Sequence, residues 1–172
     1  MSNCSNLATG ITLGCDNNIG GLKCVWITES SNVTSLGLSS PGNEIGTINM
    51  SGKFYGFQFN KNNADYIEVG EYNQQAGRDL YKQTVTLILN RREKTKRDQL
   101  ILLAQHKNLA IIAEDQNGLY WYFGETNGMN LLTNTGGSGK AKSDLNQYVL
   151  IFEGEEPNPA NTVTQAAITA NT

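Results

Sequence analysis

The sequence contains few of the residue types from which most active sites are built. Its 172 residues include one histidine and three cysteines. With a single imidazole, at His106, and no cysteines at metal-ligand spacing, the chain has no Cys-His zinc pattern. Adjacent acidic pairs, Glu114-Asp115 and Glu155-Glu156, point to opposite faces if they lie in strands, so neither pair can act as acid and base on one substrate. We therefore predict no enzymatic activity, no catalytic residue, no metal and no cofactor, and interpret these pairs as solubilising.

Strong net charge and long apolar runs are also absent. The 13 basic and 16 acidic residues leave a net charge of −3, which gives no overall attraction to nucleic acid or to an anionic membrane. No apolar run approaches the roughly 18 residues of a membrane helix, and the N-terminus lacks a secretory signal. An odd number of cysteines, Cys4, Cys15 and Cys24, cannot all pair within one chain. We expect a protein that is not exported, has no membrane partner and keeps free thiols.

The sequence is rich in short alternations of apolar and polar residues, which are typical of β-strands. One helix is predicted over Lys94 to His106, where Leu100 and Leu103 recur at helical spacing. The polar segment Ser30–Asn43 is predicted to be a surface loop, and residues 116–118 (Gln-Asn-Gly) a hairpin turn. A Ser-Gly turn is expected to join the second and third strands as a hairpin. The strands are predicted over Leu22–Glu29, Ile45–Met50, Lys53–Asn60, Tyr66–Gln75, Leu80–Asn90, Leu109–Glu114, Leu119–Phe123, a short Met129–Thr133 and Gln147–Glu153.

These elements predict a mainly β fold, an antiparallel β-sandwich or barrel with one flanking α-helix. The composition of the sequence divides the chain into three segments. Residues 1–20 are an arm rich in turn formers, residues 21–157 are the β domain, and residues 158–172 are an extended C-terminal tail. The tail is rich in Asn, Thr and Ala, and we expect it to be loose unless a partner orders it.

A glycine-rich stretch, Gly136 to Lys140, is similar to a phosphate-binding loop but fails its requirements. That loop needs a first glycine five positions before the Gly-Lys pair and a hydroxyl residue after the lysine. Asn134 and Ala141 occupy these positions, and no convincing helix follows. We interpret the stretch as a flexible loop that faces solvent or a lumen.

Two further clusters are candidate contacts between subunits. Five of the 13 basic residues lie in the seven positions 91–97. Such a run is usually a solvated face or a subunit-pairing surface, and recognition of nucleic acid is a weaker alternative. The aromatic block Tyr120–Phe123 is expected to be core on one face and interface on the other, although such a block can also stack a sugar or base. The candidate contacts are Arg91, Arg92, Glu93, Lys94, Lys96, Arg97, Trp121 and Tyr122.

Several segments together resemble structural proteins of tailed bacteriophages that infect Bacteroidetes, and the chain looks like a tail tube, or major tail, protein. The likeness covers about residues 10 to 157. It is carried by GITLGCDNNIGG (10–21), by the Phe54–Asn60 and Tyr81–Asn90 strands, by NRRE (90–93), by DQNGLYW (115–121) and by FEGEEP (152–157).

The resemblance implies a β-sandwich that forms rings of six copies, which stack into a hollow tail tube. That tube is a conduit through which DNA passes without specific binding. It implies as partners the protein itself, other tail proteins and, in contractile tails, a sheath, with location in the virion tail after synthesis in the host cytoplasm. The arm, the Ser30–Asn43 loop and the C-terminal tail are expected to contact the next ring. The alternative is another virion protein, a capsid decoration, head-completion or tail-terminator protein, that acts as a binding or assembly module.

Overall fold

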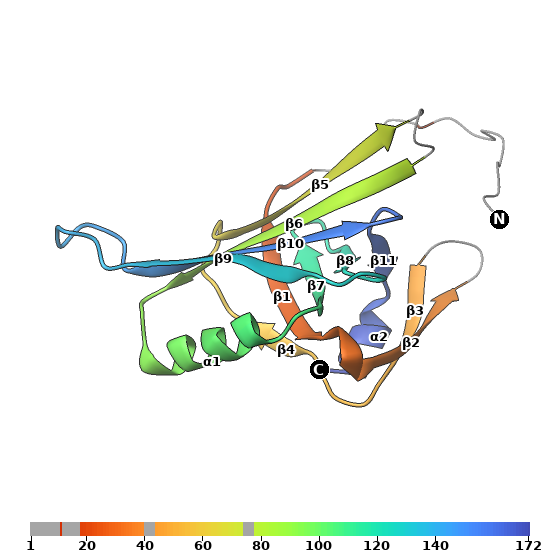
Figure 1. The fold of residues 1–172 in the computed structure, drawn as a ribbon, viewed down its shortest axis with the longest axis horizontal. Coiled ribbons are helices and arrows are strands. Elements are labelled where there is room, and N and C mark those ends of the chain that lie inside the picture. Colours follow the sequence, from red (N-terminus) through yellow and green to blue (C-terminus); the bar gives the residue numbers. More distant parts are fainter. Residues whose placement is uncertain (1–10, 12–17, 40–43, 74–77) are drawn as a thin grey trace.

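Two β-sheets packed face to face make up the body of the protein (Figure 1). The computed structural model describes residues 11, 18–39, 44–73 and 78–172. One sheet has seven strands in the order β2-β3-β11-β8-β7-β1-β4, and the other has four in the order β5-β6-β10-β9. Every pair is antiparallel except β3 with β11, which confirms the prediction of a mainly antiparallel, sandwich-like β fold.

The strands have the following bounds: β1 Leu22–Glu29, β2 Val33–Ser39, β3 Glu44–Met50, β4 Tyr55–Phe57, β5 Ala64–Asn73, β6 Arg78–Asn90, β7 Leu109–Asp115, β8 Tyr120–Phe123, β9 Asn130–Gly137, β10 Gln147–Glu156 and β11 Asn161–Val163. The helices are α1 (Lys94–Gln105), α2 (Gln165–Thr169) and a 3-10 turn at Ser30–Asn32. The predicted helix therefore differs from α1 by one residue at its C-terminal end.

Strand β7 has protein on both of its faces. All seven of its residues are buried. Leu109, Ile111 and Ala113 face the four-stranded sheet, whereas Ala110 and Ile112 point the opposite way. Because both faces need apolar side chains, the strand reads as a continuous apolar run rather than an alternation.

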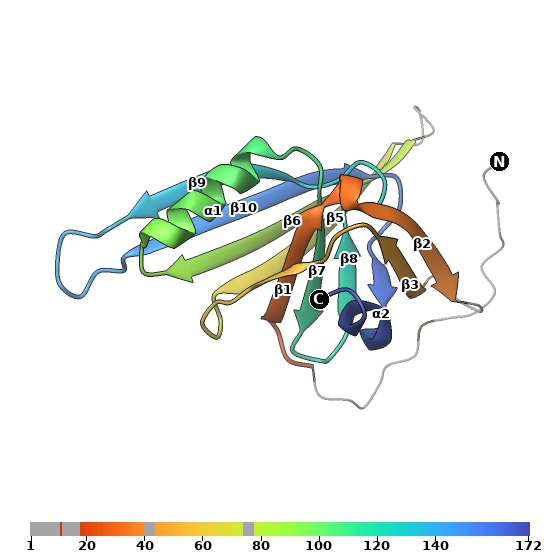
Figure 2. The same cartoon turned by 90° about the horizontal axis from the view of Figure 1, so that it is seen from below.

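The main core lies between the two sheets. Alternate residues of β6 and β10 point into it, including Val85, Leu87, Leu150 and Phe152, which have no exposed surface. Helix α1 lies on the same side of the four-stranded sheet and adds the buried side chain of Leu100 to this core (Figure 2). The opposite face of that sheet therefore contributes nothing to the core.

A second core covers the other face of the seven-stranded sheet. Ile45 and Ile48 of β3, together with Phe54, pack there against Ile112 and Tyr122. The Phe54 amide donates a hydrogen bond to the Asn171 carbonyl at 2.8 Å, which ties this core to the C-terminal segment. The seven-stranded sheet is consequently covered on both sides.

Two predictions about the chain before residue 60 are wrong. The segment expected to be a loop from Ser30 contains the 3-10 turn and strand β2, which pairs with β3; positions 40–43 of that loop lie outside the described residues. Strands β3 and β4 do not form a hairpin, because β3 pairs with β2 and β11 while β4 pairs with β1. Burial of Phe54 in the second core separates the two strands that the Ser-Gly turn was expected to join.

The C-terminal segment is part of the fold and not an extended tail. Strand β11 pairs with β8 and β3, and α2 places Ala167 and Ile168 in the second core. Thr164 caps the helix by accepting a hydrogen bond from the Ala167 amide. The segment has few apolar residues, but Val163, Ala167 and Ile168 are buried in the second core, and this packing orders it. Most of the predicted N-terminal arm lies outside the described residues.

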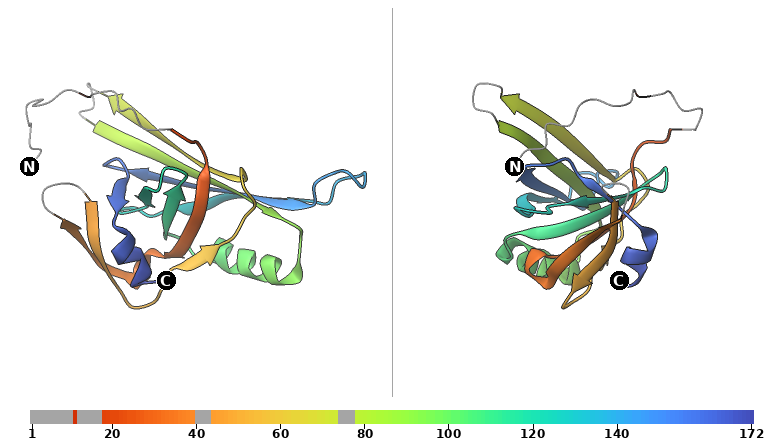
Figure 3. Two further views of the ribbon diagram at one scale, coloured as in Figure 1. Left: turned by 180° about the vertical axis from the view of Figure 1, so that it is seen from behind. Right: turned by 90° about the vertical axis from the view of Figure 1, so that its right-hand side faces the viewer.

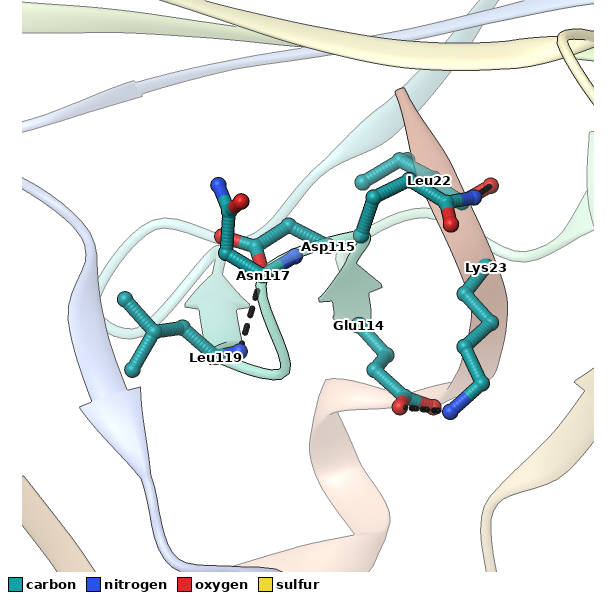
Figure 4. Close-up of polar contacts among 7 residues, drawn as sticks. Leu22, Lys23, Glu114, Asp115, Asn117 and Leu119 are labelled. Atoms are coloured by element: carbon teal, nitrogen blue, oxygen red, sulfur yellow. Dashed lines mark hydrogen bonds and ion pairs between the residues drawn. The ribbon is translucent and has the colours of Figure 1, made fainter. Parts of the chain in front are cut away.

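The hairpin of β7 and β8 was predicted correctly, and Asp115 holds its turn. One carboxylate oxygen of Asp115 accepts from the amides of Asn117 and Leu119, each at 2.9 Å (Figure 4). The other accepts from the Trp121 indole at 3.1 Å. Gly118 has a φ of +85°, the left-handed conformation that a three-residue hairpin loop requires.

Buried carboxylates correct the interpretation of the acidic pairs as solubilising. Glu114 pairs with Lys23, and this hydrogen bond raises the pKa of the Lys23 ammonium (Figure 4). Glu156 is buried and accepts from the amides of Thr126, Asn127 and Gly128, so it fixes the loop between β8 and β9. With Asp115, three of the four acidic residues have structural partners, and only Glu155 of the four is exposed.

We predict that Ile168→Ala lowers the free energy of unfolding by about 2–5 kcal/mol, because Ile168 is 4% exposed and its loss leaves a cavity in the second core. Chemical denaturation monitored by tryptophan fluorescence measures the change. Gln165→Ala, an exposed position of the same helix, is the control and should alter stability by about 0.5 kcal/mol or less. Equal, small effects from both substitutions would show that α2 does not contribute to the core.

Candidate assembly surface

No described helix or strand covers the outer face of the four-stranded sheet (Figures 1 and 3). Strand alternation places the side chains that point away from the main core on this face, which we call the open face. The charged side chains of Asp65, Lys82 and Glu153 lie on it, and seven Thr, Ile and Val residues lie among them. These seven are Ile67 and Val69 of β5, Thr84, Thr86 and Ile88 of β6, and Val149 and Ile151 of β10.

The apolar residues of the open face are substantially exposed. Ile67 is 56% exposed and Val69 is 48% exposed. Leu132, which is 61% exposed, lies at an irregularity where β9 has one residue more than its partner β10. Each aliphatic side chain removed from water contributes about 25 cal/mol per Å² of buried area, and contiguous apolar surface of this kind marks contacts with other proteins.

The two sheets differ in how their edge strands are protected. In the seven-stranded sheet, β4 has only three residues and β2 has two register irregularities, and both features discourage pairing with another chain. In the four-stranded sheet, β5 pairs with β6 over ten consecutive residues without irregularity, and no described residue pairs with its other side. Strand β9 forms the second edge of this sheet that lacks a partner among the described residues. Available edges and available apolar surface therefore coincide on one sheet.

The predicted basic contacts lie together where β6 ends and α1 begins. Arg91 pairs with Glu93 at 3.1 Å, and Arg97 pairs with Asp98 at 3.4 Å. The Arg92 guanidinium lies over the Tyr148 ring, 5.1 Å from its centroid. Lys96 donates to the carbonyls of residues 90 and 91, and Lys94 is exposed. The structure thus brings all six predicted residues to one end of the four-stranded sheet.

Helix α1 begins with an electrostatically unfavourable sequence. Its first turn contains Lys94, Lys96 and Arg97 and no acidic residue, and Glu93 at the N-cap makes no side-chain capping bond. The positive end of the helix dipole lies at this point, so each cation is disfavoured. A helix N-terminus with unfavourable charges is expected where those charges serve a contact with another molecule.

The predicted aromatic contacts lie mostly inside the protein. Tyr122 is 2% exposed and packs in the second core, where burial strongly raises the pKa of its phenol. Trp121 is half-buried against the main core, with its ring 6.1 Å from that of Tyr66. Both faces of the aromatic block therefore contact protein within the same chain, and Tyr122 presents almost no accessible surface.

The glycine-rich stretch is only partly the loop that was predicted, because Gly136 and Gly137 belong to β9 and pair with β10. The rest of it begins the loop of the β9–β10 hairpin, which projects beyond the body (Figure 1). The amides of Lys140 and Ala141 donate hydrogen bonds to the Asp144 carboxylate. These bonds lower the pKa of Asp144, and the bond from Ala141 has the larger effect. The amides that a phosphate would need are therefore already bound to a carboxylate. The side chains of Lys140 and Lys142 are exposed.

Other kinds of site find little support in the described part of the chain. No group of three or more His, Cys, Asp or Glu residues there could hold a metal ion, and no helix there is long and apolar enough to cross a membrane. Cys24 is a free, half-buried thiol whose pKa is raised by burial. The open face was missed from sequence, because alternation shows that a strand has two faces but not which face is covered.

We predict that Lys94→Glu increases the free energy of unfolding of the dissociated chain by about 0.3–1 kcal/mol at low salt, because it replaces a cation with an anion at the helix N-terminus. Lys107→Glu, just beyond the C-terminal end of α1, is the matched control and should have the opposite sign. Thermal unfolding at low and high salt measures both effects, which should shrink as salt rises. Destabilisation by Lys94→Glu would contradict this account.

Comparison with known proteins yields no match: no family model, no curated protein and no solved structure is similar to this chain.

Proposed function

We propose that the protein is a virion structural protein that assembles into six-membered rings, stacked as the tail tube through which phage DNA is ejected. The observation that carries this proposal is the four-stranded sheet, which has two unpaired edges and an apolar open face among the described residues. An exposed, regular edge strand is a template for pairing with another chain. Pairing between copies would satisfy the edges and bury the apolar side chains beside them.

The directions of the strands suit pairing between identically oriented copies. Along the sheet, β5, β6, β10 and β9 alternate in direction, because each neighbouring pair is antiparallel. Strand β9 of one copy and β5 of the next would therefore also be antiparallel. A rotation about one axis can repeat this contact and close a ring, which removes every free edge of the sheet.

The dimensions and charge of such a ring fit a conduit. Six copies of a four-stranded sheet give a barrel of 24 strands, and barrels of about 16–18 strands already leave an open channel. A net charge of −3 gives no overall attraction for DNA phosphates, which would otherwise hold the genome in the lumen. The predicted absence of catalysis is part of this proposal.

We predict that the purified protein forms rings or hollow tubes of uniform width in negative-stain electron microscopy. Leu132→Lys and Val69→Lys should abolish them, because each places a charge on an edge strand, β9 or β5, that pairing would bring against the neighbouring copy. Both residues are exposed in the isolated chain, so its circular dichroism and melting temperature should hardly change.

Leu119→Lys is the matched control, because Leu119 is 49% exposed but lies in the β7–β8 turn and in neither edge strand of the four-stranded sheet. It should leave rings and tubes intact. Dispersed globular particles from the unmodified protein would contradict the tube and favour a capsid decoration or another binding module.

A further inference from the structure

The charged residues of the four-stranded sheet are segregated along its strands. One end, which we call the basic end, comprises residues 90–98 and 136–148 and contains seven basic and three acidic residues. The other, the acidic end, comprises residues 68–73, 78–83, 124–128 and 153–156 and contains seven acidic and two basic residues. The basic end therefore has a net charge of +4 and the acidic end a net charge of −5, at opposite ends of one sheet.

The two ends are too far apart to neutralise each other. Strands β6 and β10 pair continuously from Tyr81 with Glu156, at the acidic end, to Asn90 with Gln147, at the basic end. Nine steps of about 3.3 Å separate these pairs by roughly 30 Å. The screening length at physiological salt is about 8 Å, so each end keeps its own electrostatic potential.

Several charges at each end have no partner of opposite sign among the described residues. At the basic end these include Lys94, Lys140 and Lys142. At the acidic end they include Glu71 and Asp79. A hydrogen bond from Tyr72, burial and the nearby carboxylates of Asp79 and Glu68 raise the pKa of Tyr81 at this end to about 12.

Both ends are shaped as projections. The β9–β10 hairpin projects at one end of the molecule and the β5–β6 pair at the other (Figure 1). The N-terminus of α1 adds its positive dipole to the basic end, where no acidic residue of the first turn offsets it. Complementary charge on projecting elements speeds and orients protein association.

We infer that the partner of the basic end is the acidic end of a second copy of this chain, in a head-to-tail contact along the strand direction. The inference rests on the proposed function and assigns the contact between stacked rings. In a ring of identically oriented copies, all basic ends lie on one rim and all acidic ends on the other. Like charges then repel around each rim, and stacking of a second ring relieves the repulsion at both rims.

Charge reversal tests this contact. Lys94→Glu, Lys140→Glu and Lys142→Glu together change the charge of the basic end from +4 to −2, and Glu71→Lys, Asp79→Lys and Glu155→Lys together change that of the acidic end from −5 to +1. Each triple variant alone should lose long tubes and sediment as single rings, because both of its rims then carry one sign. Mixing the two variants in equal amounts should restore tubes, because the rims of one are complementary to those of the other. Circular dichroism and electron microscopy of single rings check that each variant folds and pairs laterally.

Salt provides a second measurement that needs no variant. Tubes of the unmodified protein should shorten to rings as sodium chloride rises from about 0.1 to 1 M, where the screening length falls to about 3 Å. Variants that form tubes as long as those of the unmodified protein, or a mixture that restores none, would overturn the head-to-tail contact while leaving the rings in place. Failure of the unmodified protein to form rings at all would instead reject the proposed function.

Discussion

Burial of β7 on both faces is the constraint on which the rest of the structure depends. A strand whose seven residues are all buried needs a layer of protein on each side, and the chain supplies these layers from distant segments. The four-stranded sheet covers one side, while β3, Phe54 and α2 cover the other. Because the last ten residues help to cover this strand, the fold is complete only when the C-terminal segment has been placed.

This arrangement leaves the four-stranded sheet as the layer without a cover. Its inner face satisfies β7, but no described element remains to cover its outer face, where Ile67, Val69 and Ile151 lie. The edge strands of the two sheets differ in the same way. The seven-stranded sheet ends in a short strand and an irregular strand, whereas the four-stranded sheet ends in the regular β5 and in β9. Both sheets therefore stabilise the single chain through the main core, whereas the regular edge strand and the uncovered face both belong to the four-stranded sheet.

Local chemistry made part of this structure predictable from the sequence. The Asn-Gly turn, the spacing of Leu100 and Leu103, and the alternation in β1, β6 and β10 each depend on neighbouring residues, and the structure confirms those elements. Pairing partners depend on distant residues. Phe54 separates two strands that a turn seemed to join, and Ile168 orders a segment of low apolar content. The charge run was recognised as a cluster, but its position at one end of a sheet depends on the register of β6 with β10.

Two contacts of different direction follow from one sheet. The proposed lateral contact joins β9 of one copy to β5 of the next, and the proposed axial contact joins the basic end of one copy to the acidic end of another. Both are heterologous, because each uses two different surfaces of the same chain, and heterologous contacts give closed rings or open filaments according to their rotation. The lateral contact can close because paired strands curve and twist into a barrel. The axial contact would repeat along the strands, because its two surfaces lie at opposite ends of the sheet, so each added copy extends the assembly instead of closing it. A chain with one closing and one open contact forms a cylinder whose circumference is fixed and whose length is not.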